Sequence, residues 1–140
     1  MIISRIKQGL TYIFVSYNPK NDKIVREILN EEEFKIFNKM SEYDKIHSFN
    51  LLKLVKNNAT LKNNQNYLKL ALLHDCGKEN ISLFMRVKKV LIGDKKVEDH
   101  PRLSYEKLKN INEAIGKLAL LHHEACVQEE MKIFQSLDDK

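Results

Sequence analysis

Apolar residues recur every three or four positions along most of the chain, a spacing that puts them on one side of an α-helix. Phe34, Phe37 and Met40 are one such series. The pattern predicts helices from Asn30 onward, over about 43–57, over about 65–75, around 83–91, from His100 onward, around 111–122 and around 127–138. No alternating stretch is long enough for a useful strand, so the predicted fold class is all-α.

Polar residues mark where these helices begin and end. Asn30 precedes three glutamates, and both its side chain and their charge favour a helix start. The polar stretch 57–66 is predicted to connect two helices, and Gly77 is expected to end the second of them. Pro101 suits the first turn of the helix at His100, because that turn needs no N–H from proline.

Length and composition indicate one folded domain in the cytoplasm. The chain has 140 residues, 43% of them hydrophobic, and few glycines or prolines, so it can bury a core. No apolar run approaches a membrane span, and the N-terminal region lacks a small-residue cleavage site, so neither a membrane segment nor a signal peptide is expected. Cys76 and Cys126 are too few for a disulfide framework, which suits a reducing compartment.

The formal net charge of +5 does not by itself identify a binding partner. Such a charge is compatible with nucleic acid, an anionic membrane surface or a phosphorylated small molecule. We interpret it as a lysine-rich solvated surface, because no arginine-rich stripe with interleaved aromatic residues is present. Nucleic acid is therefore not an expected partner, and the oligomeric state is left undetermined.

Three of the five histidines continue apolar helix faces. His47, His74 and His122 each follow the spacing of apolar neighbours on their own predicted helix. Taken singly, each would be an ordinary core or surface histidine. Three polar side chains aimed inward from three helices, however, each need a buried partner. One shared metal ion would serve all three, as in many helix bundles.

The stretch LALLHDCGKEN, residues 70–80, ends an apolar run in His74 and Asp75. At a helix end, adjacent side chains can reach a common centre, and the two oxygens of a carboxylate can bridge two ions. Imidazole and carboxylate ligands together fit iron, manganese, zinc or nickel better than calcium. Attack of metal-activated water on phosphorus is the natural chemistry of such a hydrolytic site.

Five segments in order resemble the HD superfamily of metal-dependent phosphohydrolases: IHSFNLL, LLHDCGK, HPRLSYEKL, LLHHE and FQSLDD. The resemblance covers about 43–140, and the HDxGK element is its most specific part. It implies an HD domain, a single-domain helical bundle, over residues 41–140. Residues 1–40 match no motif and are expected to form an N-terminal helical extension.

The resemblance also implies a set of metal ligands. The core ligands of the superfamily correspond to His47, His74, Asp75 and one aspartate near the C-terminus. The extra ligands of the multinuclear, HD-GYP-like members correspond to His100, His122 and His123. Two divalent ions would then be bound, with Asp75 between them and a bridging hydroxide as the nucleophile. Lys78 matches the lysine of the family that contacts the scissile phosphate.

Helical phase selects Asp138 over Asp139 as the last ligand. Met131 and Phe134 belong to an apolar series that Asp138 extends by four residues, whereas Asp139 turns about a quarter-turn away. A carboxylate on a buried face needs a cation, which a metal ion would supply.

The substrate expected from this resemblance is a phosphate ester of a nucleotide or another small molecule. Activity on a cyclic dinucleotide is not expected, because ACVQEEM follows HHE where HD-GYP proteins have a Gly-Tyr-Pro loop. Two other functions have similar ligands and stay open. One is a non-catalytic, metal-binding regulatory HD module, and the other is a di-iron oxygenase with the HD fold.

Overall fold

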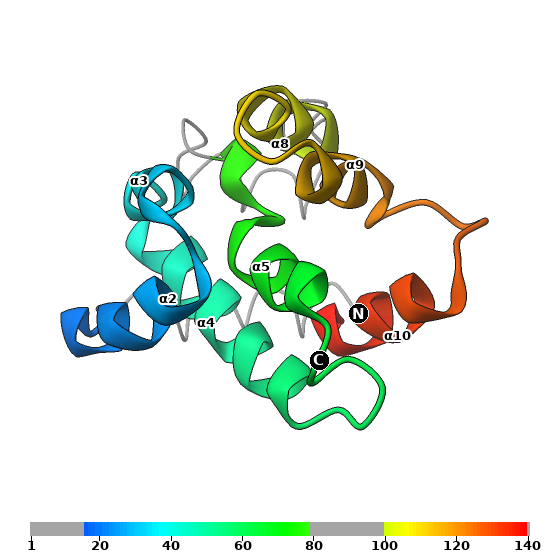
Figure 1. Cartoon of the computed structure of the whole chain (residues 1–140), viewed down its shortest axis with the longest axis horizontal. Helices are drawn as coiled ribbons and strands as arrows, with labels where there is room; N and C mark the ends of the chain where they lie inside the picture. Colours follow the sequence, from blue (N-terminus) through cyan, green and yellow to red (C-terminus); the bar gives the residue numbers. More distant parts are fainter. Residues whose placement is uncertain (1–15, 79–99, 140) are drawn as a thin grey trace, which may run out of the picture.

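The computed structural model describes residues 16–78 and 100–139, and its regular elements are helical (Figure 1). In chain order they are η1 (Pro19–Asn21), α2 (Asp22–Ile28), α3 (Glu31–Asn38), α4 (Glu42–Lys56), α5 (Gln65–Leu73), η2 (Cys76–Lys78), α8 (His100–Leu108), α9 (Glu113–Leu121) and α10 (Glu129–Asp138). No strand occurs in the two described ranges, and the predicted all-α fold class is confirmed.

Polar side chains begin several helices where the sequence predicted a start. The Asn30 Oδ1 atom accepts from the Glu33 N–H at 2.9 Å, while Glu33 Oε1 accepts from the Asn30 N–H at 2.8 Å. This reciprocal pair is a capping box, which satisfies two N–H groups at the start of α3. The side chains that cap α4, α5 and α9 are those of Ser41, Asn64 and Asn112.

The helix α5 lies at the centre of the arrangement and packs against α2, α3, α4 and α9 (Figure 1). Its residues 70–73 are fully buried. A helix that is apolar around most of its circumference must be covered on most sides, which explains the number of its neighbours. The helix α8 packs against α9 and η2, and α10 packs against α4. The C-terminal ends of α5 and α9 are thereby brought near α8 and α10.

The end of α5 differs from the prediction. The helix was expected to run to about residue 75 and to be ended by Gly77, but it ends at Leu73 with His74 as the C-cap. Gly77 lies in η2 and is needed for a different reason. A Cβ atom there would lie 2.5 Å from the His100 carbonyl oxygen and 2.6 Å from the Ser104 nitrogen. The glycine therefore permits close approach to α8, and is not a helix terminator.

The region predicted as an N-terminal extension shares the core with the rest of the chain where it is described. Val25 of α2 and Phe34 and Phe37 of α3 belong to the same buried cluster as the α5 leucines. The predicted division between residues 1–40 and 41–140 stays a prediction. The predicted helix around 83–91 and the turn after it lie outside the described residues.

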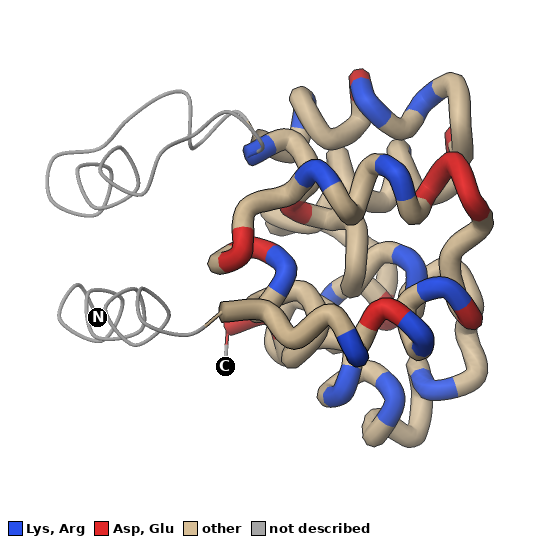
Figure 2. Tube along the Cα trace, turned by 90° about the vertical axis from the view of Figure 1, so that its left-hand side faces the viewer, with Lys and Arg blue, Asp and Glu red and all other residues tan. Residues whose placement is uncertain are grey.

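Charged positions are dispersed over the helices (Figure 2). Basic positions occur on several helices with acidic positions between them. Exposed pairs such as Lys117 and Glu113, with Nζ and Oε1 2.9 Å apart, form within single helices. Within the described ranges, no helix has the length and apolar character needed to cross a membrane.

Candidate metal centre

All seven residues predicted as metal ligands lie close together, and most stand at helix ends. They are His47 in α4, His74 at the C-cap of α5, Asp75 in the turn that follows, His100 at the start of α8, His122 at the C-cap of α9, His123 beside it, and Asp138 at the end of α10. Side chains at helix ends are free to point along the axis, so several helices can aim at one place. Two separate groups of their ligand atoms are compact enough to hold a metal ion, and so is a third group, His74, Asp75 and His122, which overlaps both.

The first group joins α4, α5 and α10. The His47 Nε2 atom lies 2.9 Å from Asp138 Oδ1, and the His74 Nε2 atom lies 3.2 Å from the same oxygen. Asp138 thus faces the cluster, whereas its neighbour Asp139 is exposed. The two side chains are oriented as helical phase predicts, while the role of Asp138 as a ligand stays a prediction.

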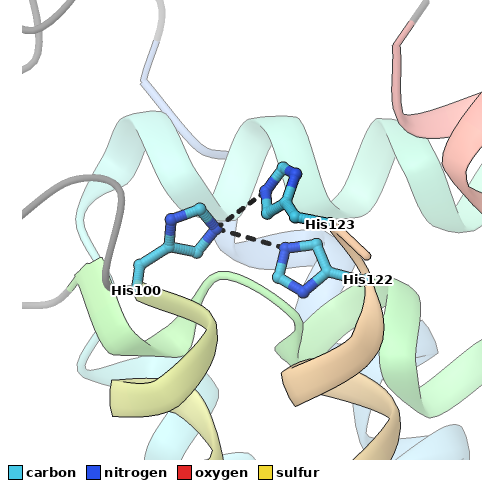
Figure 3. Close-up of side chains that lie close together, drawn as sticks. All are labelled: His100, His122 and His123. Atoms are coloured by element: carbon cyan, nitrogen blue, oxygen red, sulfur yellow. Dashed lines mark hydrogen bonds between the residues drawn. The ribbon is translucent and has the colours of Figure 1, made fainter. Parts of the chain in front are cut away.

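The second group joins α8 and the end of α9 (Figure 3). The His100 Nε2 atom lies 3.1 Å from His122 Nε2 and 3.2 Å from His123 Nε2, so three ring nitrogens converge. His100 and His122 are buried, while His123 is exposed. This group therefore reaches the surface through His123.

Asp75 stands between the two groups. Its Oδ2 atom lies 3.2 Å from His74 Nε2 and 3.8 Å from His47 Nε2. Its Oδ1 atom lies 3.0 Å from His100 Nε2 and 3.8 Å from His122 Nε2. One carboxylate oxygen therefore faces each group, which is the arrangement that a bridging ligand requires.

The tautomer of His74 tests whether a cation fits. Its Nδ1 lies 3.0 Å from the Ala71 carbonyl oxygen, which can only accept, so Nδ1 carries the proton. In the neutral ring, Nε2 then directs a lone pair at two carboxylate oxygens, those of Asp75 and Asp138. This fully buried atom has no hydrogen-bond partner among the described residues. Only a proton or a metal ion at that point would remove the repulsion.

The charges around His74 act in the same sense. Burial lowers the pKa of His74, but the negative charges of Asp75 and Asp138 outweigh burial and raise that pKa well above its ordinary value. For each aspartate, burial raises the pKa, and the charge of His74 with other cationic or hydrogen-bonding neighbours outweighs it, so both pKa values are lowered. The aspartates are therefore deprotonated, as metal ligands must be.

Two histidines of the second group, His122 and His123, are kept neutral. Burial lowers the pKa of His122, and the charge of His74 adds to that effect. Burial, followed by the charges of His122 and His100, lowers the pKa of His123 to about 4. A neutral imidazole is the form that binds a metal ion. The donor types of both groups, imidazole nitrogens and carboxylate oxygens, thus fit divalent metal ions.

Lys78, the residue predicted to contact a phosphate, lies beside the cluster. Its Nζ atom is 3.4 Å from Asp75 Oδ2, and its side chain is mostly buried at the end of η2. The ammonium group is therefore held next to the shared carboxylate.

Two of the histidines come from the same hexapeptide, a feature that the motif comparison did not use. The sequence KLALLH occurs at 69–74 and again at 117–122. In both copies the histidine is the C-cap of its helix, and its Nδ1 donates to the carbonyl oxygen of the alanine three residues earlier. The repeated hexapeptide was a signal that both rings would be oriented in the same way.

Ser104 was not singled out from the sequence. Its hydroxyl is fully buried and bonds to the main chain on both sides of Asp75, at His74 and Gly77. In the sequence it is an ordinary polar residue one helical turn after His100. Only that spacing could have pointed to it.

Comparison with known proteins agrees with the geometry. The family model for the HD domain matches residues 45–138, a range that contains every residue of the cluster. Searches of curated proteins and of solved structures gave no match.

Proposed function

The chain belongs to the HD domain family, and on that basis we propose that it is a metal-dependent phosphohydrolase. Its proposed substrate is a phosphate ester of a nucleotide or another small molecule. The family consists mostly of metal-dependent hydrolases, which supports the class of reaction. The substrate class rests on the predicted absence of a cyclic-dinucleotide loop and on the lysine beside the cluster.

One observation carries the proposal. The buried Nε2 atom of His74 faces two carboxylate oxygens, at 3.2 Å each, while Nδ1 on the opposite side of the ring donates to the Ala71 carbonyl oxygen. A neutral structural histidine would pair this atom with a donor, whereas here the position calls for a positive charge, from a proton or from a metal ion. A ligand-lined position that needs positive charge is what a metal-binding enzyme requires.

We assign the ligands to two ions. The first set is His47, His74, Asp75 and Asp138, and the second is Asp75, His100, His122 and His123. Mixed imidazole and carboxylate donors favour iron, manganese, zinc or nickel. Divalent ions held there would supply activated water and polarise the phosphoryl oxygens.

The remaining roles belong to the chain itself. Asp75 holds the two ligand sets at a fixed separation through its two oxygens. Lys78 would neutralise charge on the phosphate, because its ammonium group lies at the edge of the ligand set. The substrate would enter beside His123, the exposed member of the second set. A reducing cytoplasmic location is also part of this proposal.

The test combines metal content with a substrate screen. Protein purified without chelator is loaded with manganese, iron, zinc or nickel, and its metal content is measured by elemental analysis. Each form is assayed on phosphate monoesters, nucleotides and cyclic nucleotides. We expect two ions per chain, loss of activity in Asp75→Ala, and a loss on the order of a hundredfold in Lys78→Ala with metal content unchanged.

A matched pair controls for general damage. Asp138→Ala should lose metal and activity, whereas Asp139→Ala, at the exposed neighbouring position, should keep both. Tight metal binding without hydrolysis of any substrate, in every metal form, would contradict the proposal and favour the regulatory module. Oxygen consumption by a di-iron form would favour the oxygenase.

A further inference from the structure

The hydroxyl of Ser104 joins α8 to the turn that carries His74 and Asp75. Ser104 Oγ donates to the His74 carbonyl oxygen at 3.0 Å and accepts from the Gly77 N–H at 2.8 Å. Its residue exposure is 0%, so water does not compete for these two bonds. Both bonds go to main-chain atoms, and the two partner residues flank Asp75 in the sequence.

The same approach explains the glycine of the HDxGK element. A Cβ atom on Gly77 would lie 2.8 Å from Ser104 Oγ, and closer still to main-chain atoms of α8. The turn and the first turns of α8 are therefore in direct contact, with no room for a side chain between them. The hydroxyl of Ser104 forms the hydrogen bonds of this contact, and the absence of a side chain on Gly77 leaves room for it.

This contact fixes the relation between Asp75 and His100. Ser104 follows His100 by four residues, so the two side chains lie on the same face of α8. Anchoring Ser104 to the main chain around Asp75 therefore anchors His100 as well, with its Nε2 atom 3.0 Å from Asp75 Oδ1. No ligand of the first set lies on α8, because its members come from α4, α10 and the segment around the end of α5. His74 is also held within α5 by the bonds of its N–H and its Nδ1 to the carbonyl oxygens of Leu70 and Ala71.

We propose that Ser104 is a positioning residue for the second metal ion, holding His100 in register with Asp75. The inference rests on the two-ion assignment made above. It predicts a selective effect: removal of the hydroxyl weakens the second ion and spares the first. A residue that merely stabilised the fold would weaken both ions together.

The experiment is a calorimetric titration of metal-free protein with Mn²⁺, paired with thermal unfolding of the same samples. Wild type should bind two ions. Ser104→Ala should keep the affinity of the first ion and bind the second at least about tenfold more weakly, the range found when groups that orient ligands are removed. If Ser104→Ala does not give folded protein, Ser104→Cys, which keeps a weaker donor, is measured with the same expectation.

Ser48 provides a matched control. It is also a fully buried serine, it neighbours the ligand His47, and its Oγ has no hydrogen-bond partner among the described residues. Ser48→Ala should therefore leave both affinities unchanged. Equal affinities in Ser104→Ala and wild type, or equal weakening of both ions, would overturn the inference.

The outcome is separable from that of the proposed function. Wild type that binds two ions but hydrolyses no phosphate ester would contradict the hydrolase while the selective effect of Ser104→Ala still stood. Active wild type with an unchanged second site in Ser104→Ala would overturn the role of Ser104 alone. Wild type that binds a single ion would overturn the inference together with the two-ion assignment.

Discussion

The two copies of KLALLH, at 69–74 and 117–122, form the same local structure in different surroundings. Each ends a nine-residue helix that an asparagine caps, and each turns its histidine so that Nδ1 donates to an alanine carbonyl oxygen. Local sequence is enough to determine this much, because cap and ring contacts lie within a few residues. It leaves Nε2 of His74 and of His122 as the ring nitrogen that can act as the metal ligand we propose.

The surroundings give the same side chains opposite exposure and opposite pKa shifts. Leu72 and Leu73 in the first copy are 0% exposed, whereas Leu120 and Leu121 in the second are 38% and 41% exposed. The pKa of His74 is raised, because two carboxylates outweigh burial, and the pKa of His122 is lowered by burial and by neighbouring histidines. Identical residues therefore differ through their tertiary contacts.

The two lysines differ in the same way. The Lys69 Nζ atom lies 2.9 Å from Oε1 of Glu33, a buried carboxylate that also accepts from the Asn112 side chain. Lys117 pairs with Glu113 at the same 2.9 Å, but both side chains are exposed. The carboxylate of Glu33 is satisfied by donors of the protein, unlike the buried Nε2 atom of His74, so its role is structural.

The largest expected difference between the copies is in catalysis. His74→Ala removes a ligand that faces both aspartates, so we expect loss of the first ion and a fall in kcat/KM on the order of a thousandfold or more. His122→Ala removes a ligand of the second set only, and should give a smaller fall with the first ion kept. Elemental analysis and steady-state kinetics on the best substrate would measure both.

Equal losses in the two variants would show that the ions are bound all or none. Greater loss in His122→Ala would assign the main catalytic role to the second set, against our assignment.

Sequence patterns predicted which side chains converge for a physical reason, and failed elsewhere for another; that these side chains bind metal stays a prediction. A histidine or aspartate at a position where the helical spacing calls for an apolar residue can be recognised in the sequence. The spacing therefore predicted that His47, His74 and Asp138 face the core. The reason for Gly77 could not be predicted, because glycine is favoured both at the end of a helix and where two backbones approach closely, as here with α8. The partner of Lys69 could not either, since Glu33 belongs to a region that matched no motif.

The next largest difference concerns stability: replacing a leucine should lower the free energy of unfolding far more in the first copy than in the second. Leu73→Ala leaves a cavity in the packed core around α5 and should lower the free energy of unfolding by about 2–5 kcal/mol. Leu121→Ala, at an exposed position, should change it by less than about 0.5 kcal/mol. Urea unfolding of metal-free protein would measure both. A large loss in Leu121→Ala would mean that this surface is covered in the intact protein.

The lysines should show a smaller contrast. Lys69→Ala leaves the buried carboxylate of Glu33 without its cation, which should cost about 3 kcal/mol or somewhat less, because the Lys69 side chain is itself 21% exposed. Lys117→Ala breaks an exposed pair and should have no measurable effect. Urea unfolding of metal-free protein would measure both changes. Similar losses of unfolding free energy in the two variants would show that Glu33 is not held mainly by Lys69.

The smallest expected difference is between the buried carboxylate of Glu33 and the exposed carboxylate of Glu113, in how each affects stability at acidic pH. Burial raises the pKa of Glu33, but its bonds from Asn112, Asn30 and Lys69 outweigh burial and lower that pKa below the ordinary value. A carboxylate with a lowered folded-state pKa contributes stability above its unfolded-state pKa, about 4.3 for glutamate. That contribution is lost as the pH falls from there through the folded-state value.

Other acidic groups, Asp75 and Asp138 among them, add to the same acid loss, so variants must be compared with wild type at each pH. Glu33→Gln cannot change protonation and should flatten the loss of unfolding free energy between about pH 5 and pH 3. Glu113→Gln, at the exposed pair, should leave the wild-type slope nearly unchanged, most clearly at high salt, which screens exposed charges. Urea unfolding at several pH values gives the slopes. A wild-type slope in Glu33→Gln would mean that the Glu33 bonds persist after protonation, and the buried and exposed pairs would then not differ in acid.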